Sequence, residues 1–317
     1  MSKPVCIFRM NEAKIYEQAL ARAGLADKFE VHCLTLDQPV ADALAARTEV
    51  LLGWQPASYL NRMPRLRWVQ AMTAGVEAWL ACPDLRTDVA LCCARGTHRV
   101  SMPENILGAL FHLTKPYMQC ALDQRDSRWT KRQSVPLAGK TLGILGLGAI
   151  GQELARKAAA LEIRVIGTKC QPHSLPHVAQ VYPQEATDEV LGASDFVLLL
   201  LPSTPDTENF IDARRLRSMK PTAWLLNFAR GALIVDADLI AAVRSKTIAG
   251  AVLDVFREEP LPAIHPFWQT EGIQVLPHIG GGHPERSLAV ADIFVENARR
   301  FLAGEPLNAV VDRAQGY

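Results

Sequence analysis

The stretch TLGILGLGAIG, residues 141–151, sets three glycines between an apolar strand and the start of a helix. In this G-x-G-x-x-G pattern Gly146 permits a tight turn, and Gly148 lets the backbone approach a pyrophosphate. Gly151 lets the helix pack closely on the strand, and the N-terminus of that helix faces the phosphate charge. A tight turn without a ligand would also use these glycines, but their position between a strand and a helix favours a dinucleotide site.

Short apolar strands and helix-like segments alternate on both sides of this loop. Downstream the strands run from RVIGT (164–168) through DFVLLLL (195–201) to IQVLPHI (273–279). Upstream a separate series runs from VCIFRM (5–10) to VALCCA (89–94). Alternating β and α segments imply parallel sheets covered by helices. The sequence therefore predicts an α/β protein with two doubly wound parallel-sheet domains.

The order of these segments predicts the domain limits. We expect a flavodoxin-like substrate domain over residues 1–102, completed by the C-terminal segment 286–317, and a Rossmann cofactor domain over residues 103–285. A long helix-like stretch begins at MPENILGALFHLTKPYMQC (102–120). Because the first domain begins the chain and an amphipathic helix ends it, we expect the active site in the cleft between the domains.

The composition is that of an ordinary globular protein and bears on which kinds of partner to expect. The chain has 317 residues, 49% hydrophobic and 21% charged, and its net charge of +1 gives no reason to expect nucleic acid or membrane partners. Its longest strongly apolar run is too short for a membrane helix. Seven cysteines without a C-x-x-C pair predict reduced, mostly buried thiols in the cytoplasm. Prolines at 172 and 176 prevent a helix that would align His173 with His177, so we expect no metal site.

Charged side chains follow three later strands. NFARGALIVD (227–236) places Arg230 after one strand, GAVLDVFREEPLP (250–262) places Asp254 and the pair Glu258 and Glu259 after the next, and VLPHIGG (275–281) places His278 after the last. Singly, these residues would suit a surface ion pair, a loop charge and a core histidine. Together they supply a cationic clamp, an imidazole and a carboxylate at strand ends of one domain. That combination suits hydride transfer to a 2-oxo acid.

With these motifs in order, the chain resembles the D-isomer-specific 2-hydroxyacid dehydrogenase family, and within it the glyoxylate/hydroxypyruvate reductase branch. Besides the glycine loop and the three stretches above, the resemblance rests on LRWVQAMTAGVEAWL (66–80), LPSTPDTENFID (201–212) and the ending LNAVVDRAQGY (307–317). It implies that Arg230 holds the substrate and that His278 protonates the carbonyl oxygen. It selects Glu259 over Glu258 as the partner that fixes the tautomer of His278.

The resemblance also implies the binding residues. Backbone N–H groups of Ala74, Gly75 and Val76 would hold the substrate carboxylate, and Trp54 would form a pocket wall, although a core tryptophan fits equally well. Asp254 would hydrogen-bond the nicotinamide carboxamide. The implied cofactor site comprises Gly146, Gly148, Ala149, Ile150, Gly151, Thr168, Lys169, Leu201, Pro202, Thr207, Phe228, Ala229, Arg230, Asp254, His278, Gly280 and Gly281.

Lys169 stands where the family has an aspartate that accepts from the ribose 2′-OH of NAD. A carboxylate there would repel a 2′-phosphate, whereas Lys169 and the hydroxyl of Thr168 could bind one. We therefore expect NADP(H) to be favoured, with NAD(H) also possible.

Two departures and two alternatives stay open. IGGGHPE (279–285) puts His283 at an unusual position, and SMPENI (101–106) departs from the family near the expected hinge, just after Arg95 and His98. None of these three residues receives a role.

The alternatives are a reductase of bulkier 2-oxo acids such as phenylpyruvate, and a dinucleotide-sensing, co-repressor-like protein. The resemblance further implies a homodimer through an arm at residues 103–135, in which Trp129 would be either an interface anchor or core.

Overall fold

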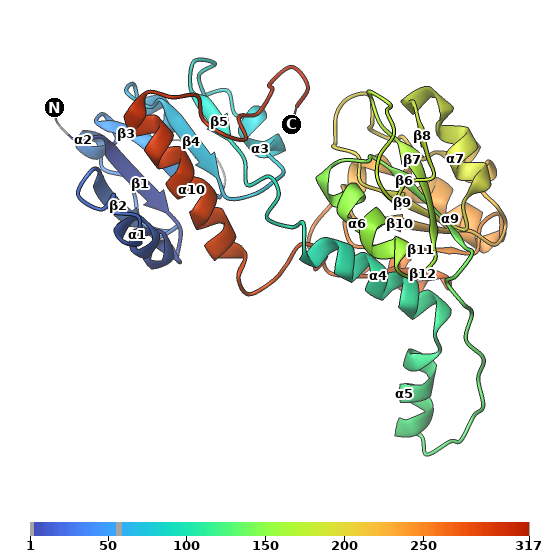
Figure 1. The fold of residues 1–317 in the computed structure, drawn as a ribbon. Coiled ribbons are helices and arrows are strands. Elements are labelled where there is room, and N and C mark those ends of the chain that lie inside the picture. Colours follow the sequence, from blue (N-terminus) through green and yellow to red (C-terminus); the bar gives the residue numbers. More distant parts are fainter. Residues whose placement is uncertain (1–2, 55–58, 317) are drawn as a thin grey trace. The chain divides into compact units, whose positions relative to one another are not determined.

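The computed structural model describes residues 3–54 and 59–316, which form two compact units (Figure 1). The first unit comprises Met1–Thr97 and His283–Tyr317, and the second comprises His98–Gly282. Each unit has its own parallel sheet and its own hydrophobic core. The predicted α/β class with two parallel sheets is confirmed.

The first unit is built on a five-stranded parallel sheet in the order β2-β1-β3-β4-β5. Its strands are β1 (Val5–Arg9), β2 (Glu30–Leu34), β3 (Thr48–Gly53), β4 (Trp68–Ala71) and β5 (Ala90–Cys92). Its helices are α1 (Ala13–Arg22), α2 (Asp42–Ala45), α3 (Glu77–Leu80), α10 (Arg286–Ala303) and the short η1 (Leu60–Arg62). The C-terminal helix α10 packs with α1 on one face of the sheet, where Phe294 stacks on Trp68 with ring centroids 5.1 Å apart.

The second unit is built on a seven-stranded parallel sheet in the order β12-β11-β10-β9-β6-β7-β8. Its strands are β6 (Thr141–Leu145), β7 (Arg164–Thr168), β8 (Gln180–Tyr182), β9 (Phe196–Leu199), β10 (Trp224–Asn227), β11 (Gly250–Leu253) and β12 (Ile273–Val275). Its helical segments are α4 (Ser101–Thr114), α5 (Tyr117–Arg125), α6 (Ala149–Ala159), η2 (Gln184–Ala186), α7 (Thr187–Ala193), α8 (Ala213–Arg217), η3 (Gly231–Leu233), α9 (Asp236–Arg244) and η4 (Pro266–Gln269). The strand order reverses between β6 and β9, which is where doubly wound sheets bind their ligands.

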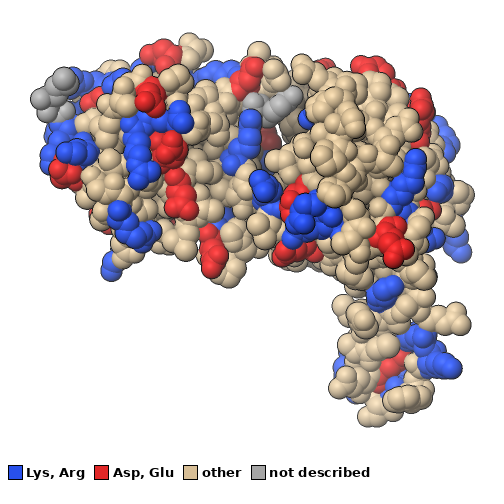
Figure 2. Space-filling model, viewed as in Figure 1, with Lys and Arg blue, Asp and Glu red and all other residues tan. Residues whose placement is uncertain are grey.

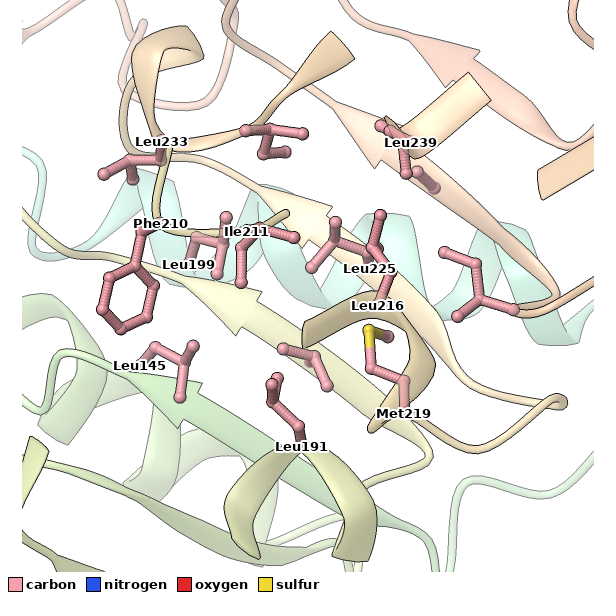
Figure 3. Close-up of a cluster of buried hydrophobic side chains, with 14 of the residues drawn as sticks. Leu145, Leu191, Leu199, Phe210, Ile211, Leu216, Met219, Leu225, Leu233 and Leu239 are labelled. Carbon is pink, nitrogen blue, oxygen red and sulfur yellow. The ribbon is translucent and has the colours of Figure 1, made fainter. Parts of the chain in front are cut away.

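Leucines from neighbouring strands form the core on one face of this sheet. Leu145, Leu199 and Leu225 come from β6, β9 and β10, and they pack with Leu191 of α7 and Leu216 of α8 (Figure 3). All five are fully buried. Because both faces of the sheet are covered, central strands such as β9 and β11 are continuous apolar runs rather than alternating ones, as is typical of a buried parallel sheet.

The expected long helix beginning near residue 102 is broken in two. Lys115, which precedes Pro116, has extended backbone angles (φ −117°, ψ 136°) that end α4 before α5 begins. The proline ring disfavours helical angles in the residue before it, which explains the break. The helix α5 and the following segment form an arm that extends from the second unit (Figure 1).

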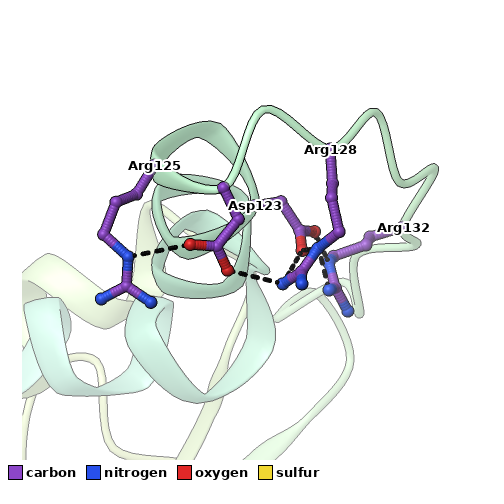
Figure 4. A network of polar contacts seen from close by, with 5 residues as sticks. Asp123, Arg125, Arg128 and Arg132 are labelled. Atoms are coloured by element: carbon purple, nitrogen blue, oxygen red, sulfur yellow. Dashed lines mark hydrogen bonds and ion pairs between the residues drawn. The ribbon is translucent and has the colours of Figure 1, made fainter.

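Acidic side chains link the residues of the arm, Asp126 to Arg125 and Arg128, and Asp123 to Arg128 and Arg132. Asp123 is buried, and its two carboxylate oxygens accept hydrogen bonds from Arg128 at 3.2 Å and Arg132 at 2.7 Å (Figure 4). Large apolar side chains of the same arm face solvent, among them Tyr117 and the fully exposed Trp129. Trp129 is therefore not core within this chain.

The cysteines are all free, as expected, but the prediction that most are buried is wrong. Cys6, Cys92 and Cys93 are buried, whereas the thiols of Cys33, Cys120 and Cys170 are exposed. Exposure follows tertiary position and cannot be inferred from the type of residue alone. Across residues 3–54 and 59–316, the structure contains no helix with the length and apolar character needed to cross a membrane.

Candidate active site

The glycine loop connects β6 to α6, and its three glycines differ in what a side chain would meet. Gly146 has a left-handed φ of 106°, and a Cβ there would lie 2.8 Å from the carbonyl oxygen of Leu200. A Cβ on Gly151 would lie 2.9 Å from the carbonyl oxygen of Gly146. A Cβ on Gly148 would meet no protein atom within 4 Å. The fold therefore needs Gly146 and Gly151, while the space at Gly148 fits the close approach of a ligand.

The loop also has the electrostatics of a phosphate site. Gly148 caps the eleven-residue helix α6, whose first turn contains no acidic residue. The first backbone N–H groups of a helix lack intrahelical partners and carry a partial positive charge. Ala149, Ile150 and Gly151 supply those groups, so the residues present fit a dinucleotide pyrophosphate.

Lys169 follows β7 directly and lies against the glycine loop. Its Nζ donates to the carbonyl oxygen of Leu147 at 3.3 Å, and the side chain is half-buried. Thr168, by contrast, is the last residue of β7 and is only 2% exposed. Of the two expected 2′-phosphate ligands, Lys169 is thus the one that presents its charged group beside the loop.

Other expected cofactor residues follow β9 and β10. The hydroxyl of Thr207 donates to the carbonyl oxygen of Pro202 at 2.7 Å and accepts from the backbone N–H of Thr204 at 2.8 Å, which closes the turn after Leu201. Thr207 therefore stabilises this turn, and its expected contact with the cofactor stays a prediction. After β10, Phe228 and Ala229 are both buried.

Arg230 lies in a turn that Asn227 organises. The buried Asn227 side chain donates from Nδ2 to the carbonyl oxygen of Arg230 at 2.8 Å and accepts at Oδ1 from the N–H of Ala229 at 3.1 Å. The guanidinium of Arg230 donates from Nη1 to the Ala229 carbonyl oxygen at 2.7 Å. Sequence reasoning assigned no role to Asn227, although a polar residue ending an apolar strand was a usable signal.

His278 and Glu259 are directly paired. The Nδ1 atom of His278 lies 2.6 Å from Oε2 of Glu259, and Oε1 of the same carboxylate accepts the backbone N–H of Phe256 at 2.9 Å. The side chain of His278 is 54% exposed and that of Glu259 is 34% exposed, so the pair is open to a small molecule. His278 has a left-handed φ of 54°, which is uncommon for a residue with a side chain.

The turn after His278 is held by Asp254, which is only 1% exposed. Its carboxylate accepts the backbone N–H of Ile279 at 2.7 Å and that of Gly280 at 2.9 Å. Burial raises the pKa of Asp254, against the opposing effect of these N–H donors and of His278. The carboxylate thus positions the residues next to His278, and its expected bond to the nicotinamide stays a prediction.

Three neighbouring strands bring these groups to one edge of the second sheet. Arg230 follows β10, Glu259 follows β11 and His278 follows β12, and the three strands are parallel and adjacent. Their carboxyl ends therefore share one edge. The site residues expected in the other unit, Trp54 and 74–76, lie after β3 and β4 of the first sheet.

In the first unit, Ala74, Gly75 and Val76 belong to the turn between β4 and α3. The hydroxyl of Thr73 donates to the carbonyl oxygen of Gly75 at 2.6 Å, which stabilises this turn. Trp54 is half-buried, and the guanidinium of Arg286 lies over its ring, 4.7 Å from the centroid. Arg286 escaped sequence reasoning because only the fold brings the start of α10 to the end of β3.

The residues left without a role lie at the unit boundaries. His98 contacts the carbonyl oxygen of Gly281 through Nδ1 at 2.8 Å, and a Cβ on Gly281 would meet the same imidazole at 2.8 Å. His283 contacts the carbonyl oxygen of Thr97 through Nε2 at 3.2 Å. Arg95 is exposed. His98 therefore joins the beginning of the second unit to its end, and His283 joins the two chain segments of the first unit.

Comparison with known proteins gives a consistent family. Residues 107–280 match the model of the D-isomer specific 2-hydroxyacid dehydrogenase, NAD binding domain. A glycerate dehydrogenase of Methylorubrum extorquens is 30% identical over 267 residues, covering 80% of this chain and 82% of the relative. Among solved structures, a D-isomer specific 2-hydroxyacid dehydrogenase of Xanthobacter autotrophicus in complex with NADPH is 30% identical, with a TM-score of 0.87 and full coverage of both chains. An NADPH-dependent glyoxylate/hydroxypyruvate reductase of Sinorhizobium meliloti in complex with NADP and sulfate is also 30% identical, with a TM-score of 0.84 and full coverage of both chains.

Proposed function

Because the chain belongs to the D-isomer-specific 2-hydroxyacid dehydrogenase family, we propose that it reduces a small 2-oxo acid, glyoxylate or hydroxypyruvate, to the D-2-hydroxy acid with NADPH. The observation that carries this proposal is the pair of His278 and Glu259, 2.6 Å apart, at the same sheet edge as Arg230. Carbonyl reduction needs a proton donor and a cation that binds the substrate, and an imidazole with a carboxylate partner and a guanidinium at the same sheet edge can supply both.

When bound in this site, the nicotinamide would supply the hydride that the carbonyl carbon takes up. Arg230 binds the substrate carboxylate and the carbonyl oxygen with its planar donors, which polarises the carbonyl group. His278 gives the proton that the carbonyl oxygen takes up, and it takes that proton back in the reverse direction. Glu259 occupies Nδ1, so proton transfer passes through Nε2.

Lys169 supports the preference for NADPH. Its ammonium lies beside the glycine loop, where a 2′-phosphate of the adenosine would add charge that a cation stabilises. The residue type also removes the carboxylate that would repel this phosphate. The relatives from Xanthobacter and Sinorhizobium, whose structures contain NADPH and NADP, use the same fold.

Steady-state kinetics with both cofactors test the proposal. The panel is glyoxylate, hydroxypyruvate, pyruvate and phenylpyruvate, and chiral chromatography identifies the product. We expect the highest kcat/KM with NADPH and glyoxylate or hydroxypyruvate, and a D product. A higher kcat/KM with NADH would refute the cofactor assignment, and phenylpyruvate as the best substrate would favour the bulkier class. Tight NADPH binding with no turnover of any acid would instead favour a dinucleotide sensor.

We also propose that the arm carrying α5 joins two copies of this chain. Such a dimer would cover the exposed apolar side chains of the arm, Tyr117, Leu122 and Trp129. The hydrogen bonds of Asp123 would already stabilise the arm in the single chain, before two copies associate. Sedimentation equilibrium is expected to give a dimer for the native chain and a shift toward monomer for Trp129→Glu. A native monomer at micromolar concentration would exclude this assembly.

A further inference from the structure

Three loops at the carboxyl edge of the second sheet meet at one arginine, Arg257, which the proposed mechanism does not use. The loops follow the neighbouring strands β9, β10 and β11, and the second and third of them contain Arg230 and Glu259. The proposed reaction needs these two residues in a fixed relative position, because Arg230 would bind the substrate while Glu259 orients the histidine that protonates it.

The loops of Arg230 and Glu259 touch each other at the backbone. Gly231 packs directly on the peptide that joins Phe256 to Arg257. A Cβ added to Gly231 would lie 2.0 Å from the carbonyl carbon of Phe256 and 2.3 Å from the backbone nitrogen of Arg257. The N–H of Phe256 in turn donates to Oε1 of Glu259 at 2.9 Å. The position of Arg230 relative to Glu259 therefore depends on how firmly these two loops are held together.

The side chain of Arg257 supplies polar contacts across this junction. Its Nη2 donates to the carbonyl oxygen of Ala232 at 3.1 Å and to that of Ile234, both in the loop of Arg230. The same nitrogen donates to Oδ1 of Asn209, in the loop after β9. Hydrogen bonds from a charged donor are stronger than those between neutral groups. One guanidinium thus connects all three loops.

The loop after β9 is also held against the loop of Arg230 by its backbone. The N–H of Asn209 donates to the carbonyl oxygen of Ala232 at 2.8 Å, and the N–H of Ile211 donates to that of Leu233 at 2.8 Å (Figure 3). Asn209 has a left-handed φ of 55°, which asparagine adopts more readily than most residues with a side chain. In this conformation its side-chain oxygen meets the guanidinium of Arg257.

Two carboxylates face the remaining donors of Arg257. Nε lies 3.7 Å from Oδ1 of Asp236, and Nη1 lies 4.0 Å from Oε1 of Glu208. The carboxylate of Asp236 also lies 3.6 Å from Nε2 of His265. Because a guanidinium is planar and presents its donors in fixed directions, these partners help to fix its rotation and with it the position of Nη2.

Building on the proposed reduction of 2-oxo acids, we propose that Arg257 is a positioning residue that holds the loop of Arg230 against the loop of Glu259. It thereby keeps the substrate-binding guanidinium in place relative to the pair of His278 and Glu259. In this role Arg257 acts through Arg230 rather than by touching the substrate. A displacement of about 1 Å at a catalytic group can lower the rate by about 10²-fold, so such a support matters for turnover.

Arg257→Met tests this role, because it keeps a long side chain and removes the donors. We expect kcat/KM for glyoxylate and hydroxypyruvate to fall about 10- to 100-fold. NADPH affinity should stay within a factor of about three of native, since the glycine loop follows β6, which is not a neighbour of β10. Arg257→Lys keeps a cationic donor on a shorter side chain and should recover part of the loss. Native kcat/KM in Arg257→Met, or an equal loss of NADPH affinity, would overturn the proposal.

Arg215→Met is the matched control. Arg215 also donates from Nη1 to a carbonyl oxygen of the loop after β9, that of Phe210, and its guanidinium lies over the Phe210 ring at 3.8 Å from the centroid. It belongs to α8 and faces Asp188 of α7, away from the junction of the Arg230 and Glu259 loops. We expect this variant to keep native kcat/KM. A fall equal to that of Arg257→Met would overturn the proposal, because loss of any partly buried arginine of this unit would then suffice.

A double-mutant cycle shows whether Arg257 acts through Arg230. In an Arg230→Lys background, the further change Arg257→Met should lower kcat/KM by less than about threefold, because the planar guanidinium that Arg257 positions is already lost. A residue that supports the unit only structurally would give the same relative loss in both backgrounds. That result would overturn the proposal.

Hydrogen exchange separates this inference from the proposed reaction. The amides of residues 209, 211 and 233–235 are hydrogen-bonded within the joined loops. In Arg257→Met they should exchange at least about 10-fold faster, while the amides of β6 and β7 keep native rates. If the native protein reduces no 2-oxo acid, the proposed function fails, and the exchange rates still decide whether Arg257 holds the loops. Native exchange in the joined loops would overturn the inference.

Asn209→Gly replaces Arg257→Met if the methionine variant does not fold. Glycine adopts the left-handed conformation of this position without strain, so the change removes one acceptor of Arg257 and leaves the backbone as it is. We expect a smaller fall in kcat/KM and a smaller rise in exchange, both in the same direction. No change in either measurement would overturn the proposal.

Discussion

The Nδ1 atom of His278 lies 2.6 Å from Oε2 of Glu259, while Oε1 of that carboxylate accepts the backbone N–H of Phe256 at 2.9 Å. The carboxylate is therefore held by its own loop and does not depend on the histidine for its orientation. The imidazole is oriented in turn by its Nδ1 contact, and in the proposed reaction its Nε2 would act on the substrate. A proton donor whose position is fixed in this way avoids reorganisation during the reaction.

The first prediction concerns this pair. His278→Gln removes the proton donor but keeps a polar side chain of similar size. We expect turnover to fall at least about 10²-fold, because general acid catalysis typically contributes that much. Fluorescence titration should show NADPH binding within a factor of about three of the native protein, since the imidazole acts on the substrate.

Two neighbouring glutamates provide the control. Glu259→Gln should also lower turnover, because the amide no longer pairs with Nδ1 as a carboxylate does. Glu258→Gln changes the exposed residue beside it and should keep native kinetics. Near-native turnover in His278→Gln, or a larger loss in the Glu258 variant than in the Glu259 variant, would remove the pair from the mechanism.

The second prediction concerns cofactor choice. Lys169→Ala should lower kcat/KM for NADPH by about 10- to 100-fold, the usual effect of losing a charge-assisted hydrogen bond, with little loss for NADH. Arg164→Ala is the matched control, because Arg164 is an exposed cation that begins β7, the strand that Lys169 follows. Equal losses with both cofactors in Lys169→Ala would show that the lysine supports the loop and not the 2′-phosphate.

The fold could be predicted from local patterns, but its details could not. Alternating apolar strands and helix-like segments predicted the two parallel sheets because that pattern is set by neighbouring residues. The break between α4 and α5 was missed, although Pro116 marks it in the sequence. The exposure of Cys33, Cys120 and Cys170 depends on what covers each thiol, and no local pattern contains that information.

For the site, too, sequence motifs predicted the main residues, whereas contacts made by tertiary folding could not be predicted. The family, predicted from the order of the motifs, is confirmed by the match to its NAD binding domain. The sequence placed Arg230, Glu259 and His278 at strand ends of one domain, and the structure shows that these three strands are neighbours in the sheet. The supports escaped prediction, because Asn227 and Asp254 act on backbone groups of turns, and Arg286 meets Trp54 only through tertiary folding. The roles of these residues stay predictions until the variants are measured.

The third prediction separates folding from ligand binding within the glycine loop. Gly146→Ala places a Cβ 2.8 Å from the Leu200 carbonyl oxygen at a φ of 106°, so we expect a loss of about 1–3 kcal/mol of unfolding free energy. Gly148→Ala meets no protein atom within 4 Å, so its unfolding free energy should stay within about 0.5 kcal/mol of native.

Gly148→Ala, which should hardly change stability, should instead weaken NADPH binding. A methyl group at Gly148 would occupy the space that the pyrophosphate needs, so NADPH affinity should fall at least about 10-fold in Gly148→Ala. Urea unfolding and NADPH fluorescence titration measure the two properties separately. Native NADPH affinity in this variant would show that the open space beside Gly148 is not the phosphate site.

The last prediction uses two aspartates of the second unit whose carboxyl groups shift in opposite directions. Burial raises the pKa of Asp254 above its ordinary value of 3.8. Burial also acts on Asp195, but the N–H of Thr141 at 2.8 Å and the ammonium of Lys220 at 3.0 Å outweigh it and lower the pKa. The two groups should therefore give opposite pH dependences of stability.

Above pH 3.8 the folded protein keeps the proton of Asp254 longer than the unfolded chain does, so the contribution of Asp254 to the unfolding free energy falls as pH rises toward the raised pKa. For Asp195 the unfolded chain holds the proton longer, so its contribution is present above pH 3.8 and is lost as pH falls through the lowered pKa. Urea unfolding between about pH 3.5 and 7, the range around and above the ordinary aspartate pKa, compares the native protein with Asp254→Asn and Asp195→Asn. The stability advantage of the native protein should shrink with rising pH against Asp254→Asn and should grow with rising pH against Asp195→Asn. The same trend in both comparisons would contradict the assignment, because a change in net charge alone would then explain it.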